Sequence, residues 1–263
     1  MSRDGGPRKT VKWSLVPALV AVSLAVAGVT AASAQAERVT ITWFGHSLFR
    51  IEFEGGPTVL TDPFEPGLWG MTYPIGPMDG VDVVTITHEH EDHNYAALAV
   101  GSPAVLRGVS VTSGVNEIDT TINGIRFYTV STCHSPGVPC PTANANAAIV
   151  IEGNGLRIAH LGDLGHVLDG DEAAAIGKLD VLLIPVGGGG ATIDATAADV
   201  VIALLEPSVI IGMHYETPEL GWGIDAIDPF LNGKTVMEVA ERSLAVSAGA
   251  LPESSTVFVL RYE

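Results

Sequence analysis

The sequence predicts one domain of α+β structure, in which two β-sheets face each other and helices lie outside. The composition is the first reason: hydrophobic residues make up 47% of the chain, and 30 Gly and 16 Pro are typical of a loop-rich α/β or α+β protein. The order of elements is the second: a β meander, then β/α units, then a return to strand. No Pro/Ser-rich linker divides the chain.

The meander is predicted from strict alternation in the segment 47–53. Phe49, Ile51 and Phe53 would face one side of a strand there, and Arg50 and Glu52 the other. Neighbouring strands are expected at 39–44 and 58–61.

A long loop is expected over 64–80, because Gly and Pro interrupt its apolar residues. Loops of this length are often functional. A packed loop with buried aromatic side chains is an equal alternative. The β-branched run 81–87 then indicates a buried strand.

The remaining elements follow from short apolar runs and from helical composition. Strands are expected at 104–111, 125–131, 147–151, 156–159, 181–184, 209–211 and 256–261, and helices at 94–100, 171–177, 194–205 and 236–246. Thr192 or Asp194 is the expected cap of the third helix.

The first 34 residues have the layout of a secretory signal peptide. Arg8, Lys9 and Lys12 precede an apolar run from Trp13 to about residue 31, and the small residues 32–34 fit a cleavage signal. We therefore expect cleavage after residue 34, a domain over 38–263 and an exported (periplasmic or secreted) protein. An uncleaved membrane anchor is the alternative, since the run approaches bilayer-spanning length.

The formal net charge of −17 argues against nucleic-acid partners and anionic membranes. The N-terminal segment holds four of the 13 basic residues, so the rest of the chain is more acidic still. We expect a small-molecule substrate and no membrane contact unless that segment is retained; the oligomeric state stays open. Cys133 and Cys140 either form a disulfide, as export permits, or are buried thiols.

A metal site is predicted at 88–93, where three His and an Asp follow a buried strand. Packing gives no reason to crowd imidazoles, whereas a divalent cation does. His88 and His90 are two residues apart and would face the same side, while Asp92 and His93 can face a second position. Two metals a few ångströms apart are what hydrolytic two-metal sites use.

The segment 87–93, Thr-His-Glu-His-Glu-Asp-His, resembles the HxHxDH motif of the metallo-β-lactamase superfamily. His134, Asp163 and His214 follow in the order of that pattern. Thr-Trp-Phe-Gly-His-Ser at 42–47, Thr-Asp-Pro-Phe at 61–64, Ile-Pro-Val-Gly-Gly-Gly-Gly-Ala-Thr at 184–192 and Met-His-Tyr at 213–215 are similar to the L-ascorbate-6-phosphate lactonase-like branch. The resemblance covers about residues 39–263.

This resemblance implies a four-layer αββα sandwich of the metallo-β-lactamase fold and a centre for two divalent metal ions that activate a water. It implies the following ligands: His88, His90 and His134 for one metal, Asp92, His93 and His214 for the other, and Asp163 between them. Nitrogen and oxygen ligands fit zinc, our first expectation, and admit manganese or iron.

Catalytic roles are expected for Asp92, within the metal site, and for His166, as a substrate contact or proton donor. The family pattern puts His46 near the site. His160 is expected to be structural and Asp62 to be a buried hydrogen-bonding anchor rather than a ligand. The glycines 187–190 lack the Lys-Ser/Thr of a nucleotide-binding loop and would let the chain pass close to the site.

The expected function is metal-dependent hydrolysis of a small-molecule ester, lactone or phosphoester. A non-catalytic metal- or ligand-binding envelope protein is one alternative. A β-lactam hydrolase is another, although the enzymes of that class lack the carboxylate at Asp163. Specificity is expected in segments 64–80 and 136–147 and after His214, including Trp222, where no residue pattern identifies the substrate.

Overall fold

The fold is described from a computed structural model, which covers Met1 and residues 37–134, 140 and 142–262. The expected signal peptide and cleavage site therefore lie outside the described residues. Within the described ranges, no helix is long and apolar enough to cross a bilayer.

Six strands of the described chain form the first sheet. Their spatial order is β15 (Ser243–Val246), β1 (Val39–Trp43), β2 (Phe49–Phe53), β3 (Thr58–Thr61), β4 (Val83–Ile86) and β5 (Ala104–Arg107). β2 is antiparallel to both β1 and β3, and β3 is parallel to β4. The carboxyl ends of β1, β3 and β4 therefore lie at the same edge.

Eight strands form the second sheet. Their order is β14 (Val236–Glu238), β16 (Thr256–Val259), β13 (Val209–Met213), β12 (Val181–Pro185), β11 (Leu156–His160), β10 (Ala145–Gly153), β9 (Ile125–Cys133) and β8 (Asp119–Ile122). β10 is antiparallel to β9 and β11, while β11, β12 and β13 are parallel. The carboxyl ends of β9, β11, β12 and β13 thus share an edge. A small ribbon joins β6 (Val109–Ser110) to β7 (Gly114–Val115).

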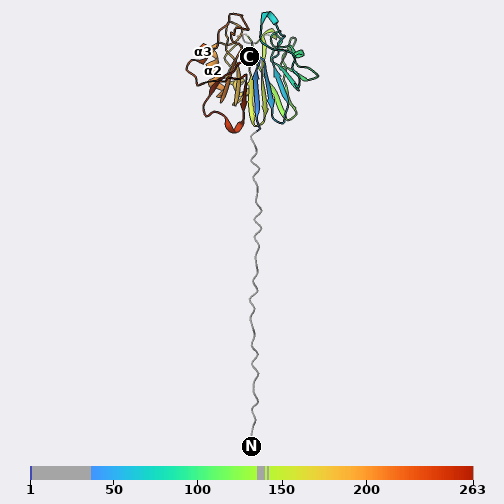
Figure 1. The fold of residues 1–263 in the computed structure, drawn as a ribbon, viewed down its shortest axis with the longest axis vertical. Helices are drawn as coiled ribbons and strands as arrows, with labels where there is room; N and C mark the ends of the chain where they lie inside the picture. The colour runs from blue at the N-terminus through green and yellow to red at the C-terminus, as the bar shows by residue number, and fades with distance from the viewer. Residues whose placement is uncertain (2–36, 135–139, 141, 263) are drawn as a thin grey trace. The chain divides into compact units, whose positions relative to one another are not determined.

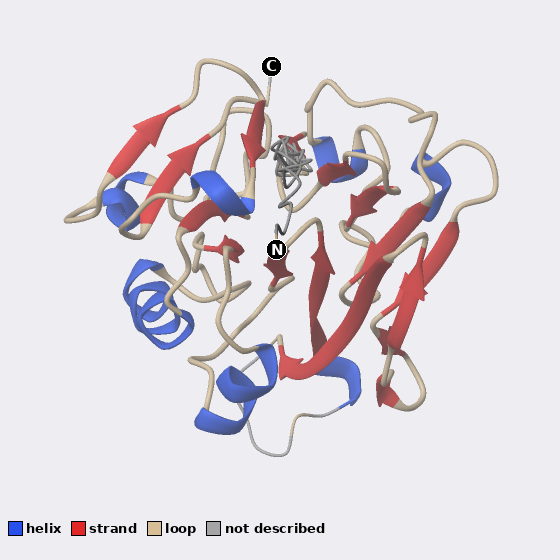
Figure 2. Cartoon of the chain, turned by 90° about the horizontal axis from the view of Figure 1, so that it is seen from below, coloured by secondary structure: helices blue, strands red, loops and turns tan. Residues whose placement is uncertain are grey.

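Helices lie at the periphery of the strands (Figures 1 and 2). They are α1 (Gly170–Ile176), α2 (Ala195–Leu205), α3 (Asp228–Leu231) and the 3-10 turns η1 (Leu68–Gly70), η2 (Ala96–Leu98), η3 (Thr142–Asn144) and η4 (Ala248–Ala250). Asp194 caps α2 by accepting from the Ala197 amide, as one of the two predicted caps. Asp169 and Glu172 form a capping box on α1.

The core joins inward-facing side chains of both sheets, which confirms the α+β sandwich. Phe49, Ile51 and Phe53 are buried on one side of β2, as the alternation predicts. A second cluster covers the other side of the six-stranded sheet and includes residues of the 64–80 segment. That outer layer consists of loop and 3-10 turns rather than α-helix.

Three predictions of secondary structure are wrong. The expected helix 236–246 is replaced by β14 and β15, which pair with β16 and β1. Helical composition is a weak preference, and pairing with two exposed strand edges overrides it. The expected helix 94–100 is only the turn η2, and the expected strand 104–111 divides into β5 and β6 at Gly108, where a Cβ would meet the Ala147 side chain. Strand β8 and helix α3 were not predicted.

Candidate metal centre

The predicted ligands all follow the carboxyl ends of strands. His88, His90, Asp92 and His93 come after β4, while His134, Asp163 and His214 come after β9, β11 and β13. The first four belong to one sheet and the other three to the second sheet. Because each set leaves its sheet at a single edge, the two sets meet between the sheets.

Among the described residues, the predicted ligands fall into two groups whose ligand atoms lie within 4.8 Å of one another, and a third such group joins Asp62 to His88 and His93. One group is His88, His90, His134 and Asp163, and the other is His46, Asp92, His93 and His214. Asp163 stands between them: Oδ2 lies 3.2 Å from His134 Nε2 and 3.4 Å from His214 Nε2, and Oδ1 lies 3.2 Å from His93 Nε2. Asp163 thus contacts imidazoles of both groups, and its bridging of two metals stays a prediction.

Buried atoms without hydrogen-bond partners show that the centre fits a cation. Within the described residues, His88 Nε2, His93 Nε2 and Asp163 Oδ1 are buried and make no hydrogen bond, although His93 Nε2 and Asp163 Oδ1 lie 3.2 Å apart. Leaving such atoms unsatisfied costs free energy, so native structures rarely do it without a reason. All three atoms offer lone pairs toward the same small region, and imidazole nitrogen and carboxylate oxygen are ligands that divalent transition metals accept.

Asp62 orients the imidazoles of His88 and His93. Its carboxylate accepts from Thr87 N at 2.8 Å, from Thr87 Oγ1 at 2.6 Å and from His93 Nδ1 at 2.9 Å. Thr87 Oγ1 in turn lies 3.1 Å from His88 Nδ1 and, having donated to Asp62, can accept the His88 proton. The Nε2 lone pairs of His88 and His93 are thereby left for the centre. Asp62 is buried and hydrogen-bonded as predicted, and that it is not a ligand stays a prediction, since it also lies within ligand distance of His88 and His93.

The electrostatics of the centre favour positive charge among its buried carboxylates. Burial and the nearby His93 lower the pKa of His88 to about 3, so this imidazole is neutral at physiological pH. Burial alone would raise the pKa of Asp163, but His214 and His93 hold it well below its usual range. For His93 burial acts downward, yet Asp163 and Asp92 raise its pKa well above the usual value. The carboxylates therefore draw positive charge into the centre.

Strained backbone accompanies three of the site residues. His46, Asp62 and His214 have φ values of 51°, 40° and 49°, in the left-handed region that residues with a Cβ rarely adopt. Such conformations cost about 1–3 kcal/mol each and cluster at functional sites. Each of the three directly follows a strand or its turn, so the strain turns these side chains toward the centre.

Two glycines allow close approach of the chain to the centre. A Cβ at Gly162 would lie 2.4 Å from Asn146 Oδ1 and 2.5 Å from Thr87 Oγ1, and the residue has φ 55°. A Cβ at Gly187 would lie 2.1 Å from the carbonyl oxygen of His214. The expectation that the glycine run lets the chain pass close to the site is confirmed at Gly187.

His46 joins the centre more closely than the predicted ligand set allowed. Its side chain is fully buried, and Nε2 lies 3.0 Å from Asp92 Oδ2. Burial and His214 lower its pKa to about 4, so it is neutral and can donate to Asp92 through Nε2–H. The signal in the sequence was the family pattern, which puts His46 near the site; the structure places it after β1, which runs in the same direction as β3 and β4.

The other two histidines bond to groups outside the two metal groups. His160 is satisfied by backbone, with Nε2 2.9 Å from Ser47 O and Nδ1 accepting from Gly162 N, which confirms its structural role. His166 contacts Cys133 O through Nδ1 at 3.2 Å and Glu172 through Nε2 at 2.9 Å. These bonds tie His166 to helix α1, and its catalytic role stays a prediction.

Cys133 and Cys140 form a disulfide beside His134, which resolves the open alternative. Part of the expected specificity segment 136–147 lies outside the described residues.

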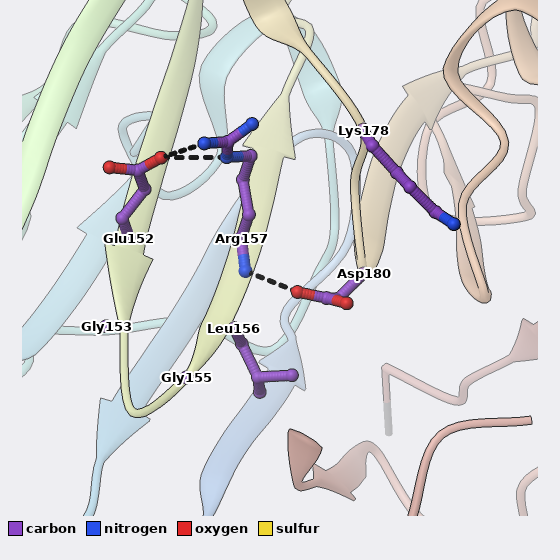
Figure 3. Close-up of a pocket in the computed structure, with 7 residues that line it drawn as sticks. All are labelled: Glu152, Gly153, Gly155, Leu156, Arg157, Lys178 and Asp180. Atoms are coloured by element: carbon purple, nitrogen blue, oxygen red, sulfur yellow. Dashed lines mark hydrogen bonds and ion pairs between the residues drawn. The ribbon is translucent and has the colours of Figure 1, made fainter. Parts of the chain in front are cut away.

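A surface pocket elsewhere is lined by residues of the β10–β11 hairpin (Figure 3). Glu152 is paired there with Arg157, whose amide donates to Asp180, and the pocket adjoins the amino end of β11, opposite the metal centre.

Comparison with known proteins agrees with this geometry. The family model described as a β-lactamase superfamily domain matches residues 40–214, which include every predicted ligand. The chain belongs to the metallo-β-lactamase superfamily. A UPF0173 metal-dependent hydrolase from Methanocaldococcus jannaschii is 34% identical over 194 residues, covering 67% of this chain and 84% of the relative. One from Thermoplasma volcanium is 31% identical over 200 residues, covering 68% and 84%.

Solved structures place the fold in the same superfamily. A Thermotoga maritima protein, assigned to the Zn-dependent hydrolases of the metallo-β-lactamase superfamily, is 34% identical. It superimposes with a TM-score of 0.64 over 84% of this chain and 98% of its own. The protein is thus a metal-dependent hydrolase of this superfamily, and its closeness to the lactonase-like branch stays an expectation.

Proposed function

We propose that the protein hydrolyses a small-molecule ester, lactone or phosphoester with water activated by two divalent metal ions, zinc being the first candidate. The observation that carries the proposal is the position of Asp163, whose two oxygens face imidazoles of both ligand groups. Bound divalent cations would supply Lewis acidity to the substrate's carbonyl or phosphoryl oxygen and would lower the pKa of water.

The residues of the chain would hold and orient this centre. His88, His90 and His134 would hold one ion and Asp92, His93 and His214 the other. Asp62 fixes the proton on Nδ1 of His93, and His46 supports Asp92 through its Nε2–H. His90 is exposed and His134 half-buried, so solvent and substrate reach the centre from that side, while the second group is buried.

The test combines a substrate screen with removal of the metals. Protein loaded with zinc or manganese is assayed on ester, lactone and phosphodiester panels, with and without chelator, and metal content is measured in parallel. We expect turnover that the chelator abolishes and that His88→Ala and Asp163→Ala reduce by about 10²- to 10³-fold, as loss of an electrostatic catalyst does. Unchanged turnover in both variants would refute the proposal.

We also propose that the domain is exported after cleavage behind residue 34. The basic start, the apolar run and the small residues 32–34 support this, and so does the disulfide, since such bonds persist in oxidising compartments. N-terminal sequencing of the mature protein is expected to begin at Gln35; a sequence that begins at Met1 would refute cleavage.

A further inference from the structure

Trp222 lies against the edge of the candidate metal centre. Its ring centroid is 5.2 Å from that of His46 and 6.0 Å from that of His214. The amides of Trp222 and Gly223 donate to Glu216 Oε2 at 3.1 and 2.9 Å, which fixes the turn that carries the indole. The indole is half-buried, whereas both imidazoles beneath it are buried. Trp222 thus forms a border between the centre and solvent.

Trp69 extends this border outward. Its ring centroid lies 5.5 Å from that of Trp222 at a tilt of 49°, and 58% of the residue is exposed. The neighbouring aromatic side chains of its segment, Phe64 and Tyr73, are buried, so the segment leaves one large apolar side chain in water. Exposed apolar surface beside a reactive centre is typical of ligand-binding sites.

The backbone of Trp69 adopts a conformation that a bulky residue rarely takes. Its φ is 47° inside the turn η1, which begins after the left-handed Gly67. A left-handed φ in a residue with a large side chain is strained and persists only where surrounding structure imposes it. The turn therefore presents the indole at a defined place rather than as a random surface residue.

The groups around the two indoles give no support for an anionic ligand. In the described ranges, the cation–π contacts involve Tyr128, Phe230 and Phe44, and none involves either Trp. The nearby Glu216 carboxylate is engaged with backbone amides. A flat apolar group would find two indole surfaces on this wall, and in the described part of the chain neither indole is paired with a cation that would attract a phosphate.

We propose that Trp69 and Trp222 form a binding wall for an aromatic group of an uncharged ester or lactone substrate, next to the bond that is cleaved. This inference rests on the proposed hydrolase function and narrows it to acyl substrates with an aromatic substituent. The aromatic group stacks on the wall, and the carbonyl points past the edge of Trp222 into the metal centre.

Binding is tested separately from turnover, so that the two proposals can fail independently. The metal-loaded protein is titrated by calorimetry with 5-phenyl-2-pyrrolidinone and with 2-pyrrolidinone, which are slowly hydrolysed lactam analogues that differ only in the phenyl group. We expect the phenyl compound to bind at least tenfold more tightly. Trp222→Ala and Trp69→Ala should remove this preference, and Trp222→Phe should keep part of it. Equal binding of the two lactams, or a preference that survives both alanine variants, overturns the wall.

Turnover supplies the second readout. We expect kcat/KM for γ-phenyl-γ-butyrolactone to be at least ten times that for γ-butyrolactone. In both alanine variants this ratio should fall toward one. Met237→Ala, which truncates another exposed apolar side chain on β14, is the matched control and should leave the ratio unchanged. If the phenyl lactam binds more tightly but neither lactone is hydrolysed, the result supports the binding wall and counts against lactone hydrolysis. Trp69 is exposed, so Trp69→Ala tests the wall even where Trp222→Ala fails to fold.

Discussion

Replacing Asp62 with Asn changes one buried atom and tests how the centre is oriented. Asp62 Oδ2 accepts from both Thr87 Oγ1 and His93 Nδ1, at 2.6 and 2.9 Å, and Oδ1 accepts from Thr87 N at 2.8 Å. An amide of the same shape has only one oxygen. With its NH2 at the Oδ2 position, it faces the Nδ1–H of His93; flipped, it faces the Thr87 amide N–H. In either orientation a donor meets a donor.

The first orientation moves the proton of His93. If Nδ1 becomes an acceptor, the ring proton shifts to Nε2, the atom that lies 3.2 Å from Asp163 Oδ1 and faces the centre. Loss of such an orienting partner lowers metal affinity by about 10- to 100-fold. That range corresponds to about 1.4–2.7 kcal/mol. The metal-free protein should also lose about 1.5–3 kcal/mol of stability, because a buried charged acceptor is removed.

The assay is a zinc competition titration of D62N against a chelating dye, with urea unfolding of the metal-free protein. Asp180→Asn is the control, because Asp180 also accepts a backbone amide proton, from Arg157, but lies at the amino end of β12. We expect zinc affinity to fall at least tenfold in D62N and to change by less than twofold in D180N. Zinc affinity of D62N within threefold of the wild type would refute the orienting role.

Three further predictions concern the surroundings of the centre. Gly162→Ala should destabilise the protein by about 1–3 kcal/mol more than Gly124→Ala in urea unfolding, because both have left-handed φ but only Gly162 lacks room for a Cβ; equal losses would contradict the close approach. The hydrogen bond with the Glu172 carboxylate raises the pKa of His166. The stabilisation from this pair is therefore full below the ordinary histidine pKa and is lost as the pH rises through the raised pKa of His166. His166→Gln should therefore cost about 0.5 kcal/mol at pH 5.5 and less at pH 9 in urea unfolding, and a pH-independent cost would contradict the ion pair. Reduction of the Cys133–Cys140 disulfide should expose two thiols to alkylation, detected by mass spectrometry, and lower stability by about 2–3 kcal/mol; labelling before reduction would contradict the pairing.

The part of the site that is local in sequence could be predicted from the sequence alone. Crowded imidazoles between His88 and His93 have no packing explanation, so the cluster itself indicates a metal. His134, Asp163 and His214 are isolated residues, and only the resemblance to a family pattern joined them to the cluster. Their proximity depends on strand direction in two sheets, which no local pattern encodes.

Features that depend on contacts between distant segments were missed or left open. His46 reaches Asp92 because the carboxyl ends of β1 and β4 lie at the same edge of the sheet. The sequence of the turn after β1 shows no local metal signal. The contact between Trp69 and Trp222 joins two loops that are far apart in the sequence, one before the first predicted ligand and one after the last. The segment 236–246 has helical composition, and only the strand edges available in the folded sheets make it β structure.

Because the centre is divided between two sheets, the stage of synthesis at which the chain can bind its metals is a late one. The N-terminal half of the chain supplies His46 and the residues from His88 to His93, whereas Asp163 and His214 come from the C-terminal half. A ribosome has therefore completed most of the domain before the last ligand emerges. Neither ligand group is complete in a chain that stops before Asp163, so such a chain holds metal weakly. Full loading with metal thus requires a chain that has been synthesised at least through β13, the strand that His214 follows.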